Sequence, residues 1–75
     1  METFYEIWDG DTNNLVDYYD TEQDALAYVS EFAEMHGHEA VRSWGMLRVR
    51  DGRSTLVAAG DDLIARASQQ VVHAD

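Results

Sequence analysis

Residues 9–20 carry the densest run of side chains that could bind a metal ion. The first, third, fifth and ninth ligands of a calcium-binding loop would come from Asp9, Asp11, Asn13 and Asp17. The match stops there. The sixth position is Asn14, where such a loop requires glycine, and the twelfth is Asp20, one methylene shorter than the usual glutamate. We therefore favour a polar hairpin turn, and a calcium-binding loop over residues 9–20 stays open as an alternative.

The other side chains that could carry chemistry are histidines and serines, and their spacing predicts neither a metal site nor a catalytic site. His36, His38 and Glu39 lie close together, but zinc sites usually take four ligands and the chain contains no cysteine. No serine stands in a nucleophile elbow, and no glycine-rich phosphate loop is present. We expect no catalytic residue, no metal, no cofactor and no enzymatic activity.

Arginines flank a predicted hairpin turn near the C-terminal end of the chain. Asp51-Gly52 favours a type I′ turn, which needs a positive φ at both central residues. A two-residue turn at this point pairs Arg50 with Arg53, Arg48 with Thr55, Met46 with Val57, and Trp44 with Ala59. Guanidinium groups that face one another repel, so an anionic group is expected nearby.

The same register separates the side chains of the sheet into two faces. The face expected to lie under the long helix holds Tyr5, Ile7, Val16, Tyr18, Leu47, Val49, Leu56 and Ala58. On the outer face, the carboxylates of Glu6 and Asp17 would form a ladder with the arginines. The candidate partner-binding residues of this outer face are Trp8, Tyr19, Trp44, Met46, Arg48, Arg50 and Arg53. Aromatic residues, methionine and arginine are enriched at protein interfaces. The alternative is that a second helix covers the end of this face that contains Trp44 and Met46.

The elements that must position these residues follow the order ββαββα. Aromatic and β-branched content predicts strands over residues 3–8, 15–19, 41–50 and 53–59. A long helix is predicted between the two hairpins, and a shorter helix begins at Gly60-Asp61-Asp62, with acidic residues at its positive end. We predict one α+β domain over residues 1–75. Its four-stranded antiparallel or mixed sheet has the long helix across one face, and residues 73–75 are expected to fray.

The helix predicted over residues 21–37 has the clearest boundaries in the sequence. Thr21 is a suitable N-cap, and Gly37 is placed to end the helix. An apolar stripe with a spacing of three and four residues comprises Ala25, Leu26, Val29, Phe32, Ala33 and His36. The corresponding stripe of the C-terminal helix comprises Leu63, Ile64, Ala67 and Val71. Both stripes must be buried against the sheet.

Charge is distributed unequally along the chain. Residues 1–40 hold eleven acidic residues and no basic one, whereas residues 41–75 hold five arginines and four acidic residues, so −11 and +1 add to the net charge of −10. This excess of negative charge argues against nucleic-acid binding. No apolar run is long enough to span a membrane, and no signal peptide is recognised, so we expect a cytoplasmic protein without membrane contact.

Several short strings resemble a group of very short uncharacterised bacterial proteins. They are Tyr5-Glu6-Ile7-Trp8-Asp9, Asn14-Leu15-Val16, Tyr19-Asp20-Thr21-Glu22, Ala25-Leu26, His36-Gly37 and Asp51-Gly52-Arg53. The resemblance covers residues 4–67 and its motifs are structural, so it implies the ββαββ core and no activity. The strand and helix around Thr21 are also similar to part of the HicB-type antitoxins, although the later elements depart from that family.

A chain of 75 residues buries a small core and gains stability by self-association. The function predicted is a non-enzymatic protein-interaction module that forms a homodimer through the arginine and tryptophan face or through a sheet edge. The alternative is an antitoxin-like regulator whose acidic half neutralises a basic partner protein.

Overall fold

The computed structural model describes the backbone of residues 2–73 and the side chains of residues 2–69. The elements are β1 (Thr3–Asp9), β2 (Asn14–Tyr19), α1 (Glu22–His36), the short 3₁₀ helix η1 (His38–Val41), β3 (Trp44–Arg50), β4 (Arg53–Ala59) and α2 (Asp61–His73). This order confirms the predicted α+β fold. The fraying expected over residues 73–75 stays a prediction, since α2 is described to His73 and residues 74 and 75 lie outside the described part.

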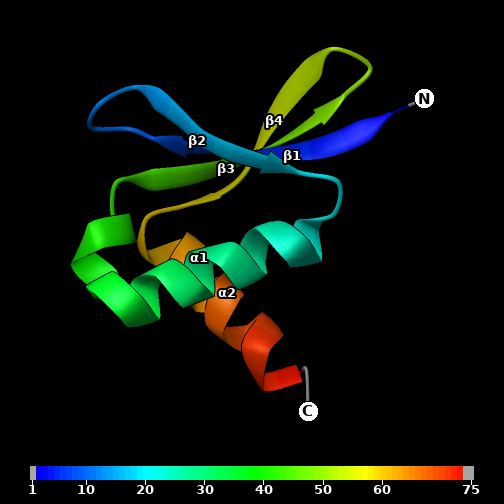
Figure 1. The fold of residues 1–75 in the computed structure, drawn as a ribbon. Helices are drawn as coiled ribbons and strands as arrows, with labels where there is room; N and C mark the ends of the chain where they lie inside the picture. The colour runs from blue at the N-terminus through cyan, green and yellow to red at the C-terminus, as the bar shows by residue number, and fades with distance from the viewer. Residues whose placement is uncertain (1, 74–75) are drawn as a thin grey trace.

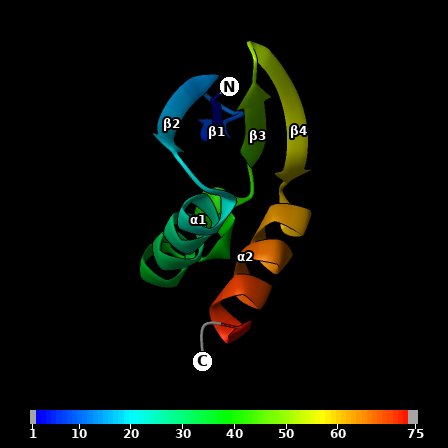
Figure 2. The ribbon, with the colours of Figure 1, turned by 90° about the vertical axis from the view of Figure 1, so that its right-hand side faces the viewer.

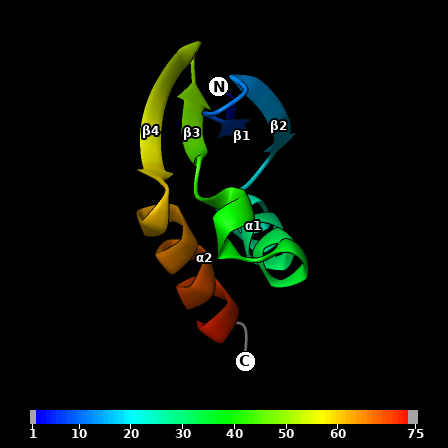
Figure 3. The same ribbon diagram turned by 90° about the vertical axis from the view of Figure 1, so that its left-hand side faces the viewer.

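The four strands form one antiparallel sheet with the order β2-β1-β3-β4. Both helices lie against the same face of this sheet, which leaves two layers (Figure 1). α1 lies under β1 and β2, and α2 lies under β3 and β4, as the two side views show (Figures 2 and 3). No described helix covers the other face of the sheet, which we call the open face.

The ends of α1 form as the sequence predicts. The Oγ1 atom of Thr21 accepts a hydrogen bond of 3.1 Å from the backbone N–H of Asp24, which satisfies one of the unpaired donors of the first turn. At the other end, Gly37 has a φ of 93°, and its N–H donates to the carbonyl of Ala33 at 2.7 Å. A positive φ strains other residues, so glycine suits this position.

The core lies between the helices and one face of the sheet. Its largest fully buried side chains are those of Ile7, Leu26, Val29, Val41, Met46 and Leu63. The predicted helical stripes supply much of it, since Ala25, Leu26, Val29, Ala33, Leu63, Ile64 and Ala67 are buried. Phe32 is half-buried, His36 is exposed, and the side chain of Val71 lies outside the described part. Val41 belongs to η1 and not to β3, so the third strand is shorter than predicted.

Candidate functional site

The hairpin of β3 and β4 turns where predicted but changes register along its length. Asp51 and Gly52 have φ values of 53° and 80°, as a type I′ turn requires. Arg50 pairs with Arg53, Arg48 with Thr55, and Leu47 with Leu56. The register then shifts, so that Met46 pairs with Ala58, and Gly45, not Trp44, pairs with Ala59. Val57 is the extra residue of this β-bulge. Beyond it, Ala58 shares the face of Met46, whereas a regular register would place it on the face of Leu47. Ala58 is buried on the helix side of the sheet, as predicted.

The prediction that Trp44 and Met46 anchor a partner is wrong. Met46 is fully buried and Trp44 is 5% exposed. Trp44 stacks on Tyr28 of α1 with ring centroids 6.0 Å apart, and its centroid lies 4.7 Å from that of Phe32. The face of β3 that contains Trp44 and Met46 therefore packs on the helices, because their larger side chains, together with Ile7, fill the space over α1 and α2.

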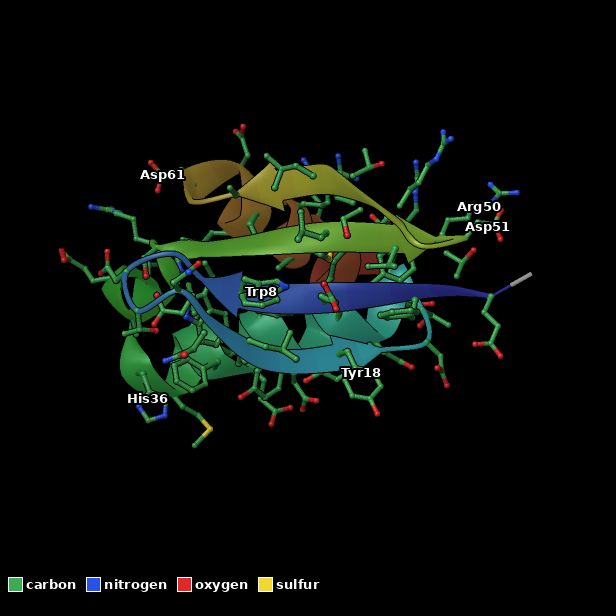
Figure 4. All side chains as sticks on the ribbon, turned by 90° about the horizontal axis from the view of Figure 1, so that it is seen from above. Trp8, Tyr18, His36, Arg50, Asp51 and Asp61 are labelled. Atoms are coloured by element: carbon green, nitrogen blue, oxygen red, sulfur yellow. The ribbon has the colours of Figure 1, made fainter. Side chains whose placement is uncertain are left out.

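The arginines consequently lie on the helix side of the sheet as well. The register of β1 with β3 places Arg48 and Arg50 on the same face of the sheet as Met46. Leu47 and Val49 lie on the opposite face. Arg48, Arg50 and Arg53 are exposed because the hairpin of β3 and β4 continues past the end of the helices. Figure 4 shows Arg50 at the tip of this hairpin. Glu6 pairs with Leu47 across the strands and so lies on the opposite face. The predicted ladder of carboxylates and guanidiniums is therefore wrong.

A second bulge exchanges the roles of two tyrosines in β2. The register with β1 shifts at Val16, so that Tyr19 pairs with Tyr5 on the helix side, and Tyr18 pairs with Glu6 on the open face. Tyr19 packs against the core and Tyr18 is 62% exposed, which reverses the predicted assignment of both residues. Burial, together with the charge of Asp17, raises the pKa of Tyr19 to about 12. Tyr19 is thus a packing residue.

The open face carries apolar side chains from all four strands, which neighbour one another in the strand register around Glu6. Its residues are Phe4, Glu6, Trp8, Leu15, Tyr18, Gly45, Leu47, Val49, Ser54, Leu56 and Ala59. The exposed large apolar side chains of the described residues are four, and Leu15, Tyr18 and Leu56 of this face are three of them, at 44%, 62% and 60% exposure. Figure 4 looks onto this face, with Trp8 over the middle of the sheet and Tyr18 beside β2. Contiguous apolar surfaces of this kind mark interaction sites.

One carboxylate, that of Glu6, lies in the middle of the open face, and Glu2 and Asp20 border the face beside Phe4 and Tyr18. Glu6 is half-buried in the middle of β1, and its Oε1 atom accepts a hydrogen bond of 3.0 Å from the indole Nε1 of Trp8. This contact fixes the orientation of the indole ring. Nearby, the rings of Phe4 and Tyr18 meet edge to face with centroids 6.1 Å apart. The aromatic side chains of the open face are thus held in place by their neighbours.

A shallow hollow of about 240 Å³ lies at one end of the open face. It is lined by Trp8, Gly10, Ser43, Trp44, Gly45, Leu47, Leu56 and Ala59. Gly45 has no side chain, so the sheet is lowest between Trp8 and Leu56. The hollow offers an apolar recess into which a side chain of a partner can insert.

Of the predicted partner-binding residues, the structure places only Trp8 on the open face. Phe4 shares the predicted outer face with Trp8 but is not among the predicted partner-binding residues. Tyr18 was predicted to face the core because the bulge in β2 was not anticipated. Leu56 pairs with Leu47 as predicted, but the helices cover the opposite face of this hairpin. One signal in the sequence points to them. β1 carries large apolar residues at both even and odd positions, and these positions point to opposite faces of the sheet. Two helices that cover one face therefore leave the apolar side chains of the other face exposed.

The candidate calcium loop folds as a β-hairpin, and its ligands make other contacts. The Oδ1 atom of Asp9 accepts hydrogen bonds from the Ser43 hydroxyl at 2.8 Å and from the N–H of Asp11 at 3.0 Å. Asp17 accepts from the N–H of Tyr18 at 2.8 Å. Among the described residues, no three histidine, aspartate or glutamate side chains lie close enough together to hold a metal ion. The calcium alternative therefore has no support in this geometry.

His36 also makes a structural contact. Its ring lies 4.3 Å from that of Phe32, one turn earlier in α1, and a histidine in the last turn interacts favourably with the helix dipole.

In the described part of the chain, neither helix has the length and apolar character needed to cross a membrane. Comparisons of the chain with protein-family models, with curated proteins and with solved structures find no match, so its function must be inferred from its own surface.

Proposed function

We propose that this chain is a small non-enzymatic protein-interaction module that self-associates through its open face. The observation that carries the proposal is the concentration of exposed apolar side chains on the one sheet face that no described helix covers. Burying this face against a second copy removes the apolar side chains of both copies from water, which favours association.

The distribution of charge supports a second copy as the occupant. The protein has fifteen acidic residues, but among the strand residues of the open face only Glu6 is acidic, and Glu2 and Asp20 border the face beside Phe4 and Tyr18. Two copies can therefore meet through this face without bringing rows of carboxylates together. A strongly basic partner would instead be attracted to the acidic turns and to α1.

The area available sets the expected affinity. Four strands about 4.8 Å apart and seven residues long present a surface of about 440 Å² before corrugation. Stable complexes bury about 800 Å² on each partner, so this interface is at the small end of the range. We expect a dissociation constant in the micromolar range.

The sheet edges suit self-association less well. β2 and β4 are the two edge strands, and both are bulged, at Val16 and at Val57. Bulges interrupt the row of backbone hydrogen-bonding groups that edge-to-edge pairing requires. Of the two modes of dimerisation predicted from the sequence, the face is therefore favoured over the edge.

The proposal is tested by substituting Leu56, which is 60% exposed on the open face, with lysine. Leu56→Lys is expected to raise the dissociation constant of the dimer at least about tenfold, as measured by sedimentation velocity. The free energy of unfolding should change by no more than about 0.5 kcal/mol, since the side chain is exposed.

Met35→Lys is the matched control, because Met35 is 71% exposed but lies on α1. Both variants lower the net negative charge by one, so a weaker dimer in Leu56→Lys alone cannot come from electrostatic repulsion between copies. A wild-type protein that stays monomeric at concentrations of about 100 μM would overturn the proposal, as would equal weakening by both substitutions.

A further inference from the structure

The tip of the hairpin of β3 and β4 holds a second surface, distinct from the open face. Arg48, Arg50, Asp51, Arg53 and Thr55 line an open hollow of about 460 Å³, which we call the arginine hollow. Its arginines lie on the helix side of the sheet, beyond the helices, and Figure 4 shows Arg50 and Asp51 at the end of the molecule. The hollow gathers three of the chain's five basic residues in a protein with a net charge of −10.

Within the described part of the chain, these guanidiniums differ from the other two arginines, which each form an ion pair. Arg42 pairs with Asp61 at 3.5 Å, and Arg66 pairs with Glu22 at 3.2 Å. Among the residues whose side chains the structure describes, no carboxylate lies within ion-pair distance of the arginines in the hollow. Arg50 and Arg53 also lie directly opposite one another, and like charges in that position destabilise a hairpin. An anionic ligand would relieve this repulsion.

We propose that the arginine hollow binds an extended acidic segment of a partner protein, with carboxylates at alternate positions. β4 is an edge strand, and its regular part runs from Arg53 to Leu56, before the bulge. A segment that pairs with this edge as an added strand places its alternate side chains opposite Arg53 and Thr55.

The side chains of the hollow match this arrangement. A carboxylate opposite Arg53 meets its guanidinium directly, in the two-pronged geometry that guanidinium and carboxylate favour. A carboxylate opposite Thr55 lies beside a short side chain, and Arg48, which pairs with Thr55 from β3, lines the same hollow. Two acidic residues separated by one position on the segment therefore engage both arginines.

The charge of the whole molecule favours such a short segment over a nucleic acid. Three guanidiniums and Asp51 leave a local charge of +2, which a pair of carboxylates balances. A long polyanion would extend past the hollow and meet the acidic remainder of the surface, which repels it.

The test uses the heptapeptide Thr-Glu-Thr-Glu-Thr-Glu-Thr and its isomer Thr-Thr-Glu-Glu-Glu-Thr-Thr, titrated separately into isotopically labelled protein. We expect the alternating peptide to shift the backbone amide resonances of residues 53–56 and to bind more tightly than the isomer. Arg48→Gln should weaken this binding about tenfold, because it removes one charge-assisted contact. Arg42→Gln is the matched control, since Arg42 lies beyond the opposite end of β3 and should leave peptide affinity unchanged.

Inorganic phosphate and a single-stranded oligonucleotide are titrated in parallel. Tighter binding of either than of the alternating peptide would overturn the proposal, because the hollow would then be a phosphate or nucleic-acid site. Equal affinity of the two peptides would overturn the added-strand geometry. An unchanged spectrum with the alternating peptide, or equal affinities in wild type and Arg48→Gln, would also refute the proposed site.

Discussion

At the scale of single residues, Glu6 is the feature of the open face that most opposes self-association. Its carboxylate lies among Trp8, Tyr18 and Leu47, and its hydrogen bond from Trp8 satisfies one of its oxygens. A second copy seated on this face would remove water from a charged group that has few partners, which costs free energy. Glu6 therefore limits the affinity of the proposed dimer.

Glu6→Gln is expected to strengthen the proposed dimer about tenfold. The amide oxygen of glutamine can still accept the hydrogen bond from Trp8, while the buried charge is lost. Sedimentation equilibrium measures the effect. Glu31→Gln serves as control, because it makes the same chemical change on an exposed position of α1. A weaker dimer in Glu6→Gln would contradict this expectation, because the Glu6 carboxylate would then have to make a favourable contact with the second copy.

At the scale of elements, the turn between β1 and β2 is attached to the start of β3. The N–H of Gly10 donates to the carbonyl of Ser43 at 2.7 Å, and the Ser43 hydroxyl donates to Asp9. A Cβ atom on Gly10 would lie 2.8 Å from the same carbonyl oxygen, so this close approach requires glycine. These contacts join the first hairpin to the second without passing through the core.

The contact between Asp9 and Ser43 makes stability depend on pH. The Ser43 hydroxyl, together with the N–H of Asp11, lowers the pKa of Asp9 from its ordinary value of 3.8. A carboxyl whose pKa falls on folding stabilises the folded protein above its ordinary pKa, and this contribution is lost as the pH falls through the folded value. Asp9→Asn should thus be less stable than wild type at neutral pH, with a smaller difference at about pH 2.

Urea unfolding of wild type and Asp9→Asn at the two pH values measures this difference. An NMR titration of the Asp9 carboxyl group provides a direct check, because Ser43→Ala should return its pKa toward the ordinary value. A pKa that Ser43→Ala leaves unchanged would show that the hydroxyl is not the cause.

At the scale of the whole molecule, apolar attraction and electrostatic repulsion oppose each other in the proposed dimer. Each copy carries a net charge of −10, mostly on the turns and helices, while the strand residues of the open face include one carboxylate, that of Glu6. Repulsion between copies acts over long distances and is screened by salt, whereas the burial of apolar surface does not depend on screening.

Raising the sodium chloride concentration from about 50 mM to about 500 mM should therefore strengthen self-association. The same change should weaken binding of the acidic peptide to the arginine hollow, because that contact is electrostatic. Sedimentation velocity and the peptide titration, each repeated at the two salt concentrations, test both parts. A dimer that dissociates on addition of salt would indicate an interface of ion pairs instead.

The existence and order of the elements could be predicted because their signals are local. The cap at Thr21, the glycine at Gly37 and the turn at Asp51-Gly52 act within a few residues of the chain. Such signals do not depend on what packs against them. The predicted strand over residues 53–59 coincides with β4, and α1 ends where its capping residues place it.

The sequence by itself determined the ββαββα order, the burial of most residues of the helical stripes and the net negative charge. Only the tertiary structure decided which face of the sheet the helices cover and which face is left open. In β3, Trp44 and Met46 occupy one face and Leu47 and Val49 the other, so the pattern suits burial of either face. The bulges at Val16 and Val57 then move side chains from one face to the other, because one extra residue reverses the alternation of every residue beyond it.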